Sequence, residues 1–256
     1  MSIDKDLLKR LTLLYVEDDD IIRNELSQLL ANFFSQVLVA KDGKEGLRTF
    51  LENQDTIDIV LTDINMPLYN GIEMVKKIRN IDSKISVIFA TAYSDNEFLL
   101  DAIKLRVQEY IIKPIDIRKL LSFLNDIASN LYQEFLLKQQ QYELTKYKEI
   151  LDSNNIVIKT DARLNITYVN QLFCDISGYS DSELIGKEFK SLKFPDVSND
   201  IYTDLYAKVL NNKPWHGNLK NIKKDKTHYT CDTHVFPTLG ENGEMNGAIS
   251  IQKDIT

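Results

Sequence analysis

Five short, almost entirely apolar runs lie within the first 112 residues, and amphipathic stretches separate them. The runs are residues 11–16, 36–40, 57–61, 85–90 and 110–112. A strand that is buried on both faces reads as a continuous apolar run, and a helix between two such strands lets them pair in parallel. The alternation therefore predicts an α/β domain over residues 1–128, with a five-stranded parallel sheet and helices on both of its faces.

A long stretch without glycine or proline begins within this domain, after Pro114, and ends before Gly178. Its first part predicts one continuous helix, because apolar residues recur at spacings of three and four, as in a coiled coil. We expect the beginning of this seam to pack on the first domain's own sheet. Residues 129–151 then form a linker, which is either a solvated single helix or a helix that pairs with a second copy. The seam consists of Ile117, Leu121, Leu124, Ala128, Leu131 and Phe135, and it resumes, displaced, at Leu137, Leu144, Tyr147 and Leu151.

Residues 152–256 have a different pattern, which is typical of an α+β domain with an antiparallel sheet. A predicted hairpin over residues 156–169 comes first, and short helices follow as far as residue 210. Three further strands are predicted at residues 215–223, 227–237 and 244–253, and the turn Gly240-Glu-Asn-Gly243 joins the last two. His216, His228 and His234 are expected on a solvated face, with His234 on the same side of its strand as Asp232.

Composition excludes several classes of function. The net charge is −7, so neither domain has the basic excess of an autonomous nucleic-acid binder. No apolar stretch is long enough to cross a membrane, and no secretory signal is visible. The chain has two cysteines, Cys174 and Cys231, which are too few for a disulfide framework. We therefore expect a reduced, cytoplasmic protein that neither binds nucleic acid nor spans a membrane.

Polar side chains follow four of the predicted parallel strands. Glu17 and Asp18 follow the first strand, Asp63 the third, Thr91 the fourth and Lys113 the fifth. Because the carboxyl ends of parallel strands meet at one edge of a sheet, these groups are expected to converge.

The chemistry that needs such a set is phosphoryl transfer to a carboxylate. Clustered carboxylates repel one another unless a hard cation such as Mg²⁺ neutralises them. Asp63 is then the candidate nucleophile, and Asn65 is expected to turn its backbone carbonyl toward the metal. Lys113 and Thr91 are expected to stabilise the transferred oxygens.

The motifs that carry these residues resemble the receiver domain of bacterial two-component response regulators. They are Leu14-Tyr-Val-Glu-Asp-Asp19, Asp63-Ile-Asn-Met-Pro67 with Asn70-Gly71, Thr91-Ala92 and Tyr110-Ile-Ile-Lys-Pro114. The resemblance implies a flavodoxin-like fold that a histidine kinase phosphorylates on Asp63. It also implies that Asp18, Asp63 and the Asn65 carbonyl bind Mg²⁺ with Glu17 acting through water, and that Tyr110 and Thr91 form the switch.

A phosphatase of the haloacid dehalogenase type is the main enzymatic alternative, since it also uses an aspartate nucleophile and Mg²⁺. That family places a second aspartate two residues after the nucleophile as a general acid. Here this position is Asn65, which cannot deliver a proton. We therefore expect a signalling protein and not an enzyme.

The second domain resembles PAS sensor domains through residues 170–186 and the closing segment 247–256. Within that group it is most similar to the aerotaxis receptors, whose PAS domain holds FAD. The resemblance implies flavin contacts at Asp196, Trp215 and Asn221. However, Lys193-Phe194 replaces that subgroup's Arg-His pair and removes two polar anchors, and Trp215 is also interpretable as a core aromatic. We expect this domain to be colourless or only partly loaded with flavin.

No output module is recognisable after the PAS resemblance. The chain therefore either signals by contact with a downstream protein partner, or is the N-terminal part of a longer hybrid histidine kinase or diguanylate cyclase. In either case a homodimer formed through the linker or the PAS domain is a further expectation.

Overall fold

The computed structural model describes residues 3–67, 69–91, 105 and 107–256. It divides into two compact units, Met1–Lys138 and Gln139–Thr256, which are described in turn. No helix within the described residues is long and apolar enough to cross a membrane.

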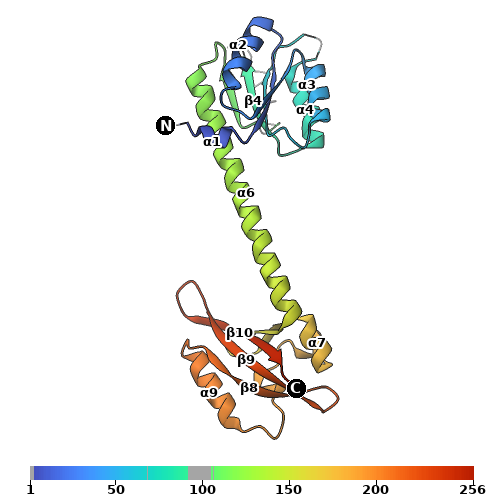
Figure 1. Ribbon diagram of the computed structural model, residues 1–256, viewed down its shortest axis with the longest axis vertical. Helices are drawn as coiled ribbons and strands as arrows, with labels where there is room; N and C mark the ends of the chain where they lie inside the picture. The colour runs from blue at the N-terminus through green and yellow to red at the C-terminus, as the bar shows by residue number, and fades with distance from the viewer. Residues whose placement is uncertain (1–2, 68, 92–104, 106) are drawn as a thin grey trace. The chain divides into compact units, whose positions relative to one another are not determined.

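The first unit is built on a parallel sheet with the strand order β2-β1-β3-β4-β5 (Figure 1). The strands are β1 (Thr12–Val16), β2 (Gln36–Ala40), β3 (Ile59–Asp63), β4 (Ser86–Thr91) and β5 (Glu109–Ile112). The helices described with them are α1 (Lys5–Leu8), α2 (Asp20–Leu30), α3 (Gly43–Glu52), α4 (Gly71–Ile81) and the beginning of α6 (Ile117–Asn154).

Successive residues of the central strands enter two different cores. Leu14 and Val16 of β1 pack with α3 and α4, whereas Leu13 and Tyr15 pack with α2 and α6. Figure 1 shows these two helix pairs on opposite faces of the sheet. Every residue of β1 and β3 is buried, which explains why their sequences read as unbroken apolar runs. The predicted doubly covered parallel sheet is confirmed.

Short polar side chains begin the helices that follow the strands. The Asp19 carboxylate accepts hydrogen bonds from the backbone N–H groups of Ile21 and Ile22 and so caps α2. Asn70 caps α4 in the same way. Gly71, the next residue, lies against the end of β3, where an added Cβ would collide with the backbone carbonyl of Asp63. The Asn70-Gly71 pair therefore lets α4 start close to the sheet edge.

Helix α6 begins in the first unit and continues into the second. Leu121, Leu124 and Ala128 of the predicted seam are buried in the first unit's core, and so are Leu120 and Ile127, which the seam did not include. Farther along, Phe135 is 58% exposed and the apolar residues after it are also exposed.

The second unit contains an antiparallel sheet with the strand order β7-β6-β10-β9-β8. Its strands are β6 (Ile156–Asp161), β7 (Ile166–Val169), β8 (Trp215–Ile222), β9 (His228–Leu239) and β10 (Met245–Asp254). Its helices are the end of α6, α7 (Gln171–Ser177), α8 (Asp181–Leu184), the 3-10 helix η1 (Phe189–Leu192) and α9 (Asn199–Leu210).

One face of this sheet packs on a core formed with α7 and α9. The core includes Phe173 of α7, Tyr202 and Leu205 of α9, and Trp215 of β8. Asn170 connects the end of α6 to this unit, because its side chain donates to the backbone carbonyls of Asp152 and Asn155. The predicted α+β domain with an antiparallel sheet is confirmed, and so is the long helix before it.

Candidate functional site: an acidic centre at the edge of the parallel sheet

Three carboxylates converge at the carboxyl edge of the first sheet. Glu17 and Asp18 come directly after β1, and Asp63 is the last residue of β3. One ligand oxygen from each lies within 4.8 Å of those of the other two. Glu17 is only 1% exposed and Asp63 only 5%, whereas Asp18 is exposed. The convergence of these three residues agrees with the order of strands in a parallel sheet.

Lys113 brings an ammonium group into the same place from the end of β5. Its Nζ donates to both carboxylate oxygens of Glu17, at 2.9 and 2.8 Å, and to Oδ2 of Asp63 at 2.5 Å. The four side chains thus come from three different strand ends. Three neighbouring carboxylates and one ammonium, which contacts two of them, leave an excess of negative charge that a hard divalent cation with oxygen ligands would offset. The donor set therefore fits Mg²⁺.

Burial and charge act against each other in this site. Burial raises the pKa of Glu17 above its usual value, although the hydrogen bond and charge of Lys113 act in the opposite direction. For Lys113, burial by itself lowers the pKa, but the hydrogen bonds and charges of Asp63 and Glu17 raise it above its usual value. The ammonium therefore stays charged at neutral pH.

Two further residues, which the sequence did not predict, form hydrogen bonds with groups of the site. The Tyr15 hydroxyl donates to Oε2 of Glu17 at 3.3 Å, and burial followed by the Glu17 charge raises the pKa of Tyr15. Arg23 donates to the backbone carbonyls of Glu17 and Asp18, at 2.8 and 3.3 Å. Strand alternation could have indicated Tyr15, because it lies two residues before Glu17 on the same face of β1.

The neighbourhood of Asp63 is fixed by backbone contacts. Its Oδ1 accepts a hydrogen bond from the backbone N–H of Asn65 at 3.1 Å. The hydroxyl of Thr62 donates to the Asp63 carbonyl at 2.9 Å. The contact with Asn65 orients the carboxylate, while the predicted role of the Asn65 carbonyl in metal binding stays a prediction.

The two predicted switch residues lie on the neighbouring strands. Thr91 is the last residue of β4 and pairs in register with Ile112, while Tyr110 of β5 pairs with Phe89. The Tyr110 side chain is 45% exposed. Ala92, the second residue of the predicted Thr-Ala motif, lies outside the described residues, so the switch remains a prediction.

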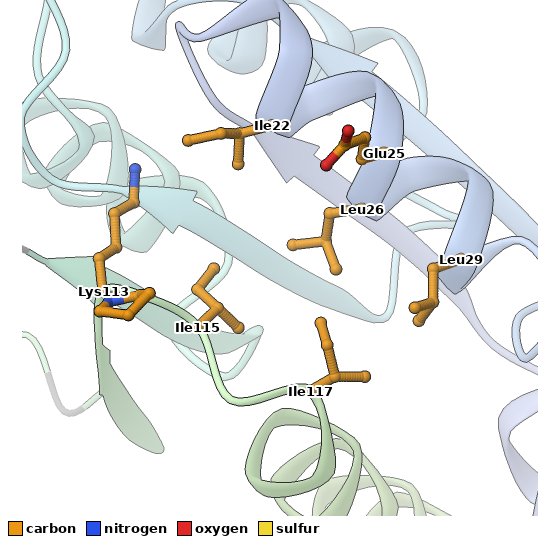
Figure 2. A pocket seen from close by; sticks show the side chains of 8 residues that line it. Ile22, Glu25, Leu26, Leu29, Lys113, Ile115 and Ile117 are labelled. Carbon is orange, nitrogen blue, oxygen red and sulfur yellow. The ribbon is translucent and has the colours of Figure 1, made fainter.

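An apolar pocket borders the acidic site. It has a volume of about 360 Å³, and Lys113 belongs to its lining (Figure 2). Ile22 and Leu26 of α2 face Ile115 and Ile117 across it, as Figure 2 shows. The surface beside the acidic centre is therefore largely hydrophobic.

The three predicted flavin residues have different surroundings in the second unit. Asp196 is exposed and forms a 2.6 Å ion pair with Lys220. The indole of Trp215 is 6% exposed, and its Nε1 donates to Asp204 at 2.9 Å. Trp215 thus packs in the core with its one polar atom paired.

Asn221, the third of these residues, lies in a buried network of neutral polar side chains. It accepts from the Tyr202 hydroxyl and donates to Oε1 of Gln252, each at 3.4 Å. The Gln252 amide in turn donates to the Ser250 hydroxyl at 3.0 Å. Trp215, Asn221 and Asp196 each have a polar contact with another protein side chain, and their predicted role in flavin binding stays a prediction.

Comparison with known proteins identifies both units. Residues 13–125 match the response regulator receiver domain. The chain therefore carries a receiver domain of the response regulator family. Residues 153–256 match the PAS domain, so a PAS domain follows the receiver in the same chain.

The chain is also similar to curated regulatory proteins. It is 35% identical over 97 residues to a nitrogen fixation regulatory protein of Klebsiella pneumoniae, a match that covers 38% of this chain and 20% of the relative. It is 30% identical over 159 residues to the transcriptional regulatory protein HptR of Staphylococcus aureus, which covers 61% of this chain and 59% of that protein. The chain thus spans between a fifth and three fifths of the length of these two relatives.

Among solved structures, the N-terminal domain of an uncharacterized protein from Wolinella succinogenes is 35% identical to this chain. That match covers 48% of this chain and 98% of the other, with a TM-score of 0.46.

Proposed function

We propose that this chain is a two-component signalling protein that accepts a phosphoryl group on Asp63 from a histidine kinase. The observation that carries the proposal is the convergence of Glu17, Asp18 and Asp63, with the Lys113 ammonium in contact with Glu17 and Asp63. A buried group of like charges is costly, and Lys113 balances only part of it. The excess negative charge favours a site that works with a cation.

Glu17, Asp18, Asp63 and the backbone carbonyl of Asn65 are the groups that would hold Mg²⁺. The bound ion supplies positive charge that offsets both the carboxylates and the phosphoryl oxygens. Glu17 and Asp18 lie next to each other in the chain, and Asp63 faces them from the neighbouring strand. The site's own residues thus set the position of the nucleophile relative to the ion.

In the proposed reaction, a carboxylate oxygen of Asp63 attacks the phosphorus atom of the kinase's phosphohistidine. The O–P bond forms, the N–P bond breaks, and the leaving imidazole nitrogen takes up a proton. The Lys113 ammonium lies 2.5 Å from Oδ2 of Asp63, where it can offset charge on the transferred oxygens. Thr91 is proposed to donate its hydroxyl to the same oxygens, and Tyr110 to respond to this contact.

The direct test is labelling of the full chain with acetyl phosphate and Mg²⁺. We expect one phosphoryl group on Asp63, and we expect Asp63→Asn to abolish it. Asp20→Asn is the matched control, because Asp20 lies beside the site but is 81% exposed and pairs with Arg23. Labelling of Asp63→Asn at the wild-type level would show that another residue is the nucleophile. Rapid catalytic turnover would favour the haloacid dehalogenase alternative.

We further propose that the kinase contacts the apolar pocket beside Lys113. A protein donor must bring its phosphohistidine to Asp63, so it must contact the surface that borders the site. Ile22 lines this pocket at 39% exposure, while Ile21, one residue earlier, is 69% exposed and is not in the lining.

This pair of residues gives a matched test of the docking surface. Ile22→Asp is expected to slow transfer from a phosphorylated histidine kinase that labels the wild-type chain, by about tenfold. It should leave labelling by acetyl phosphate unchanged, and Ile21→Asp should alter neither reaction. An equal loss with both phosphodonors would mean that the substitution damages the site itself.

The PAS domain is proposed to sense a signal or to bind a downstream protein in the cytoplasm. The chain is proposed to form a homodimer through α6 or through the PAS domain. Flavin fits poorly, because the residues predicted to contact it are engaged in internal contacts. A second proposal for the output is that a kinase or cyclase module belongs to the same protein, and the greater length of the two curated relatives is compatible with it. The mass of the protein isolated from its native cell decides between these outputs.

A further inference from the structure

Two histidines and an aspartate meet on the exposed face of the second sheet, away from the core. His216 of β8 and His234 of β9 are directly opposite each other in the antiparallel register. Their rings stack with centroids 4.0 Å apart and planes 11° from parallel. Asp232 lies two residues before His234 and therefore on the same face of β9. Its Oδ1 is 2.7 Å from Nε2 of His216.

These three side chains offer ligands to a metal ion. One ligand atom from each lies within 4.8 Å of the other two. In a tetrahedral zinc site with bonds of about 2.0–2.2 Å, neighbouring ligand atoms are roughly 3.3–3.6 Å apart. The ligand atoms of His216 and Asp232 are 2.7 Å apart and would separate slightly around an ion, while the His234 ring would turn out of its stack to direct a nitrogen at it. His216 and Asp232 are 59% and 40% exposed, so water can fill the remaining coordination positions.

The two imidazoles and one carboxylate indicate which metal ions this cluster would bind. Imidazole suits zinc, copper and nickel, whereas magnesium and calcium prefer sites made entirely of oxygen ligands. The acidic centre of the receiver domain is such an oxygen-only site, so the two clusters in this chain differ in chemistry. We propose that His216, Asp232 and His234 form a binding site for a borderline divalent cation, of which Zn²⁺ is the representative.

Binding would displace the proton that the His216–Asp232 hydrogen bond shares and would bridge β8 to β9. Because His216 follows Trp215 directly, the bridge would lie at the start of β8, on the opposite face from the buried indole. The alternative is a stacked histidine pair that only forms an ion pair with Asp232, and this alternative predicts no binding of zinc.

Calorimetric titration of the full chain with Zn²⁺ tests the proposal. Millimolar Mg²⁺ is kept present to occupy the receiver site, and Asp18→Ala checks that receiver carboxylates do not account for the signal. We expect one zinc site in the wild-type chain, unchanged in Asp18→Ala and weakened at least tenfold in His216→Ala and in His234→Ala. His228→Ala is the matched control, because His228 lies at the far end of β9 against Phe194.

A second measurement locates the site. Trp215 is the chain's one tryptophan, and Cu²⁺ quenches a nearby indole at short range. We expect saturable quenching in the wild-type chain and in His228→Ala, and its loss in His216→Ala and His234→Ala. Circular dichroism checks that each variant is folded. Zinc binding and copper quenching that survive in both histidine variants would overturn the proposal, as would the absence of zinc binding in the wild-type chain.

Discussion

The receiver domain and the PAS domain bury different kinds of polar group. Among the described residues, the receiver buries two carboxylates, Glu17 and Asp63, next to one another at a sheet edge. The polar residues buried in the PAS domain are all neutral, namely Thr160, Asn170, Ser177, Asn221, Thr233, Ser250 and Gln252. A buried charge without full compensation costs several kcal/mol, while a neutral group needs only one or two hydrogen bonds. The buried charge is therefore the stronger sign of a functional site.

The comparison also separates two kinds of interaction. Asn221 and Gln252 satisfy each other inside the PAS domain, so their polarity requires no group from outside. The receiver carboxylates share one lysine and remain in excess, so the proposed cation would supply the positive charge that the described side chains lack. Function is easier to infer from a buried group whose charge the protein itself does not balance.

The largest effect is expected when the receiver's one internal counter-ion is removed. Lys113→Met leaves Glu17 and Asp63 buried without the ammonium, and we expect the receiver to lose about 3 kcal/mol of unfolding free energy. Phosphorylation by acetyl phosphate should also be lost. Urea unfolding followed by far-UV circular dichroism measures the stability, while Trp215 fluorescence reports the PAS domain separately, because the receiver has no tryptophan.

The control for this variant is a double substitution. Adding Glu17→Gln removes one of the two orphaned carboxylates, so Lys113→Met with Glu17→Gln should recover part of the lost stability but none of the phosphorylation. A Lys113→Met chain as stable as the wild type would mean that the buried charges are not costly here, and the contrast with the PAS domain would fail.

The two halves of helix α6 differ in the burial of their apolar side chains. Its first half is buried in the receiver, where Leu120 and Leu124 are 0% exposed. In its second half Leu144 is 68% exposed and Leu151 is 45% exposed. Repeated exposed leucines at seven-residue spacing are what a paired helix needs. The proposed homodimer would cover these exposed leucines of α6.

The second prediction tests this pairing. Leu144→Glu places a charge in the proposed seam of both copies, and we expect the dimer to dissociate about 100-fold more readily, which corresponds to ~2.7 kcal/mol. Gln139→Glu adds the same charge on a different face of the helix and should have little effect. Sedimentation with and without beryllofluoride measures the dimer and its response to the phosphorylated state. A wild-type monomer under both conditions at tens of micromolar would exclude the paired helix.

The sequence predicted the receiver well because its signals are local or follow from parallel topology. Glu17, Asp63 and Lys113 each come at a strand end, and a parallel sheet brings strand ends together whatever the details of packing. Tyr15 was missed although strand alternation indicates it, whereas the role of Arg23 depends on where α2 places its side chain.

The PAS domain was harder to interpret, because its important contacts cross between strands. The pairing of His216 with His234 depends on the register of β8 and β9, and a shift of one residue would separate the two rings. From the sequence, Asn221 is only a polar residue in a predicted strand. The folded structure shows that it hydrogen-bonds to Tyr202 and Gln252. Periodicity predicted the strands correctly, but it does not determine register.

The smallest expected effect distinguishes a structural network from a flavin site. Asn221→Ala removes one partner from Tyr202 and one from Gln252, so we expect a loss of about 1–2 kcal/mol in the unfolding free energy of the PAS domain, followed by Trp215 fluorescence. Thr238→Ala is the control, because Thr238 makes its side-chain contact at the surface, with Asn246. If the network only stabilises the fold, the purified wild-type chain has no stoichiometric flavin absorbance, and the stability lost in Asn221→Ala does not depend on added FAD.

A yellow wild-type chain that releases flavin on denaturation, and a colourless Asn221→Ala chain, would make Asn221 a cofactor residue. The buried neutral groups of the PAS domain would then bind a ligand, as the receiver carboxylates are proposed to do. The two domains would then differ only in the kind of ligand that their buried polar groups bind.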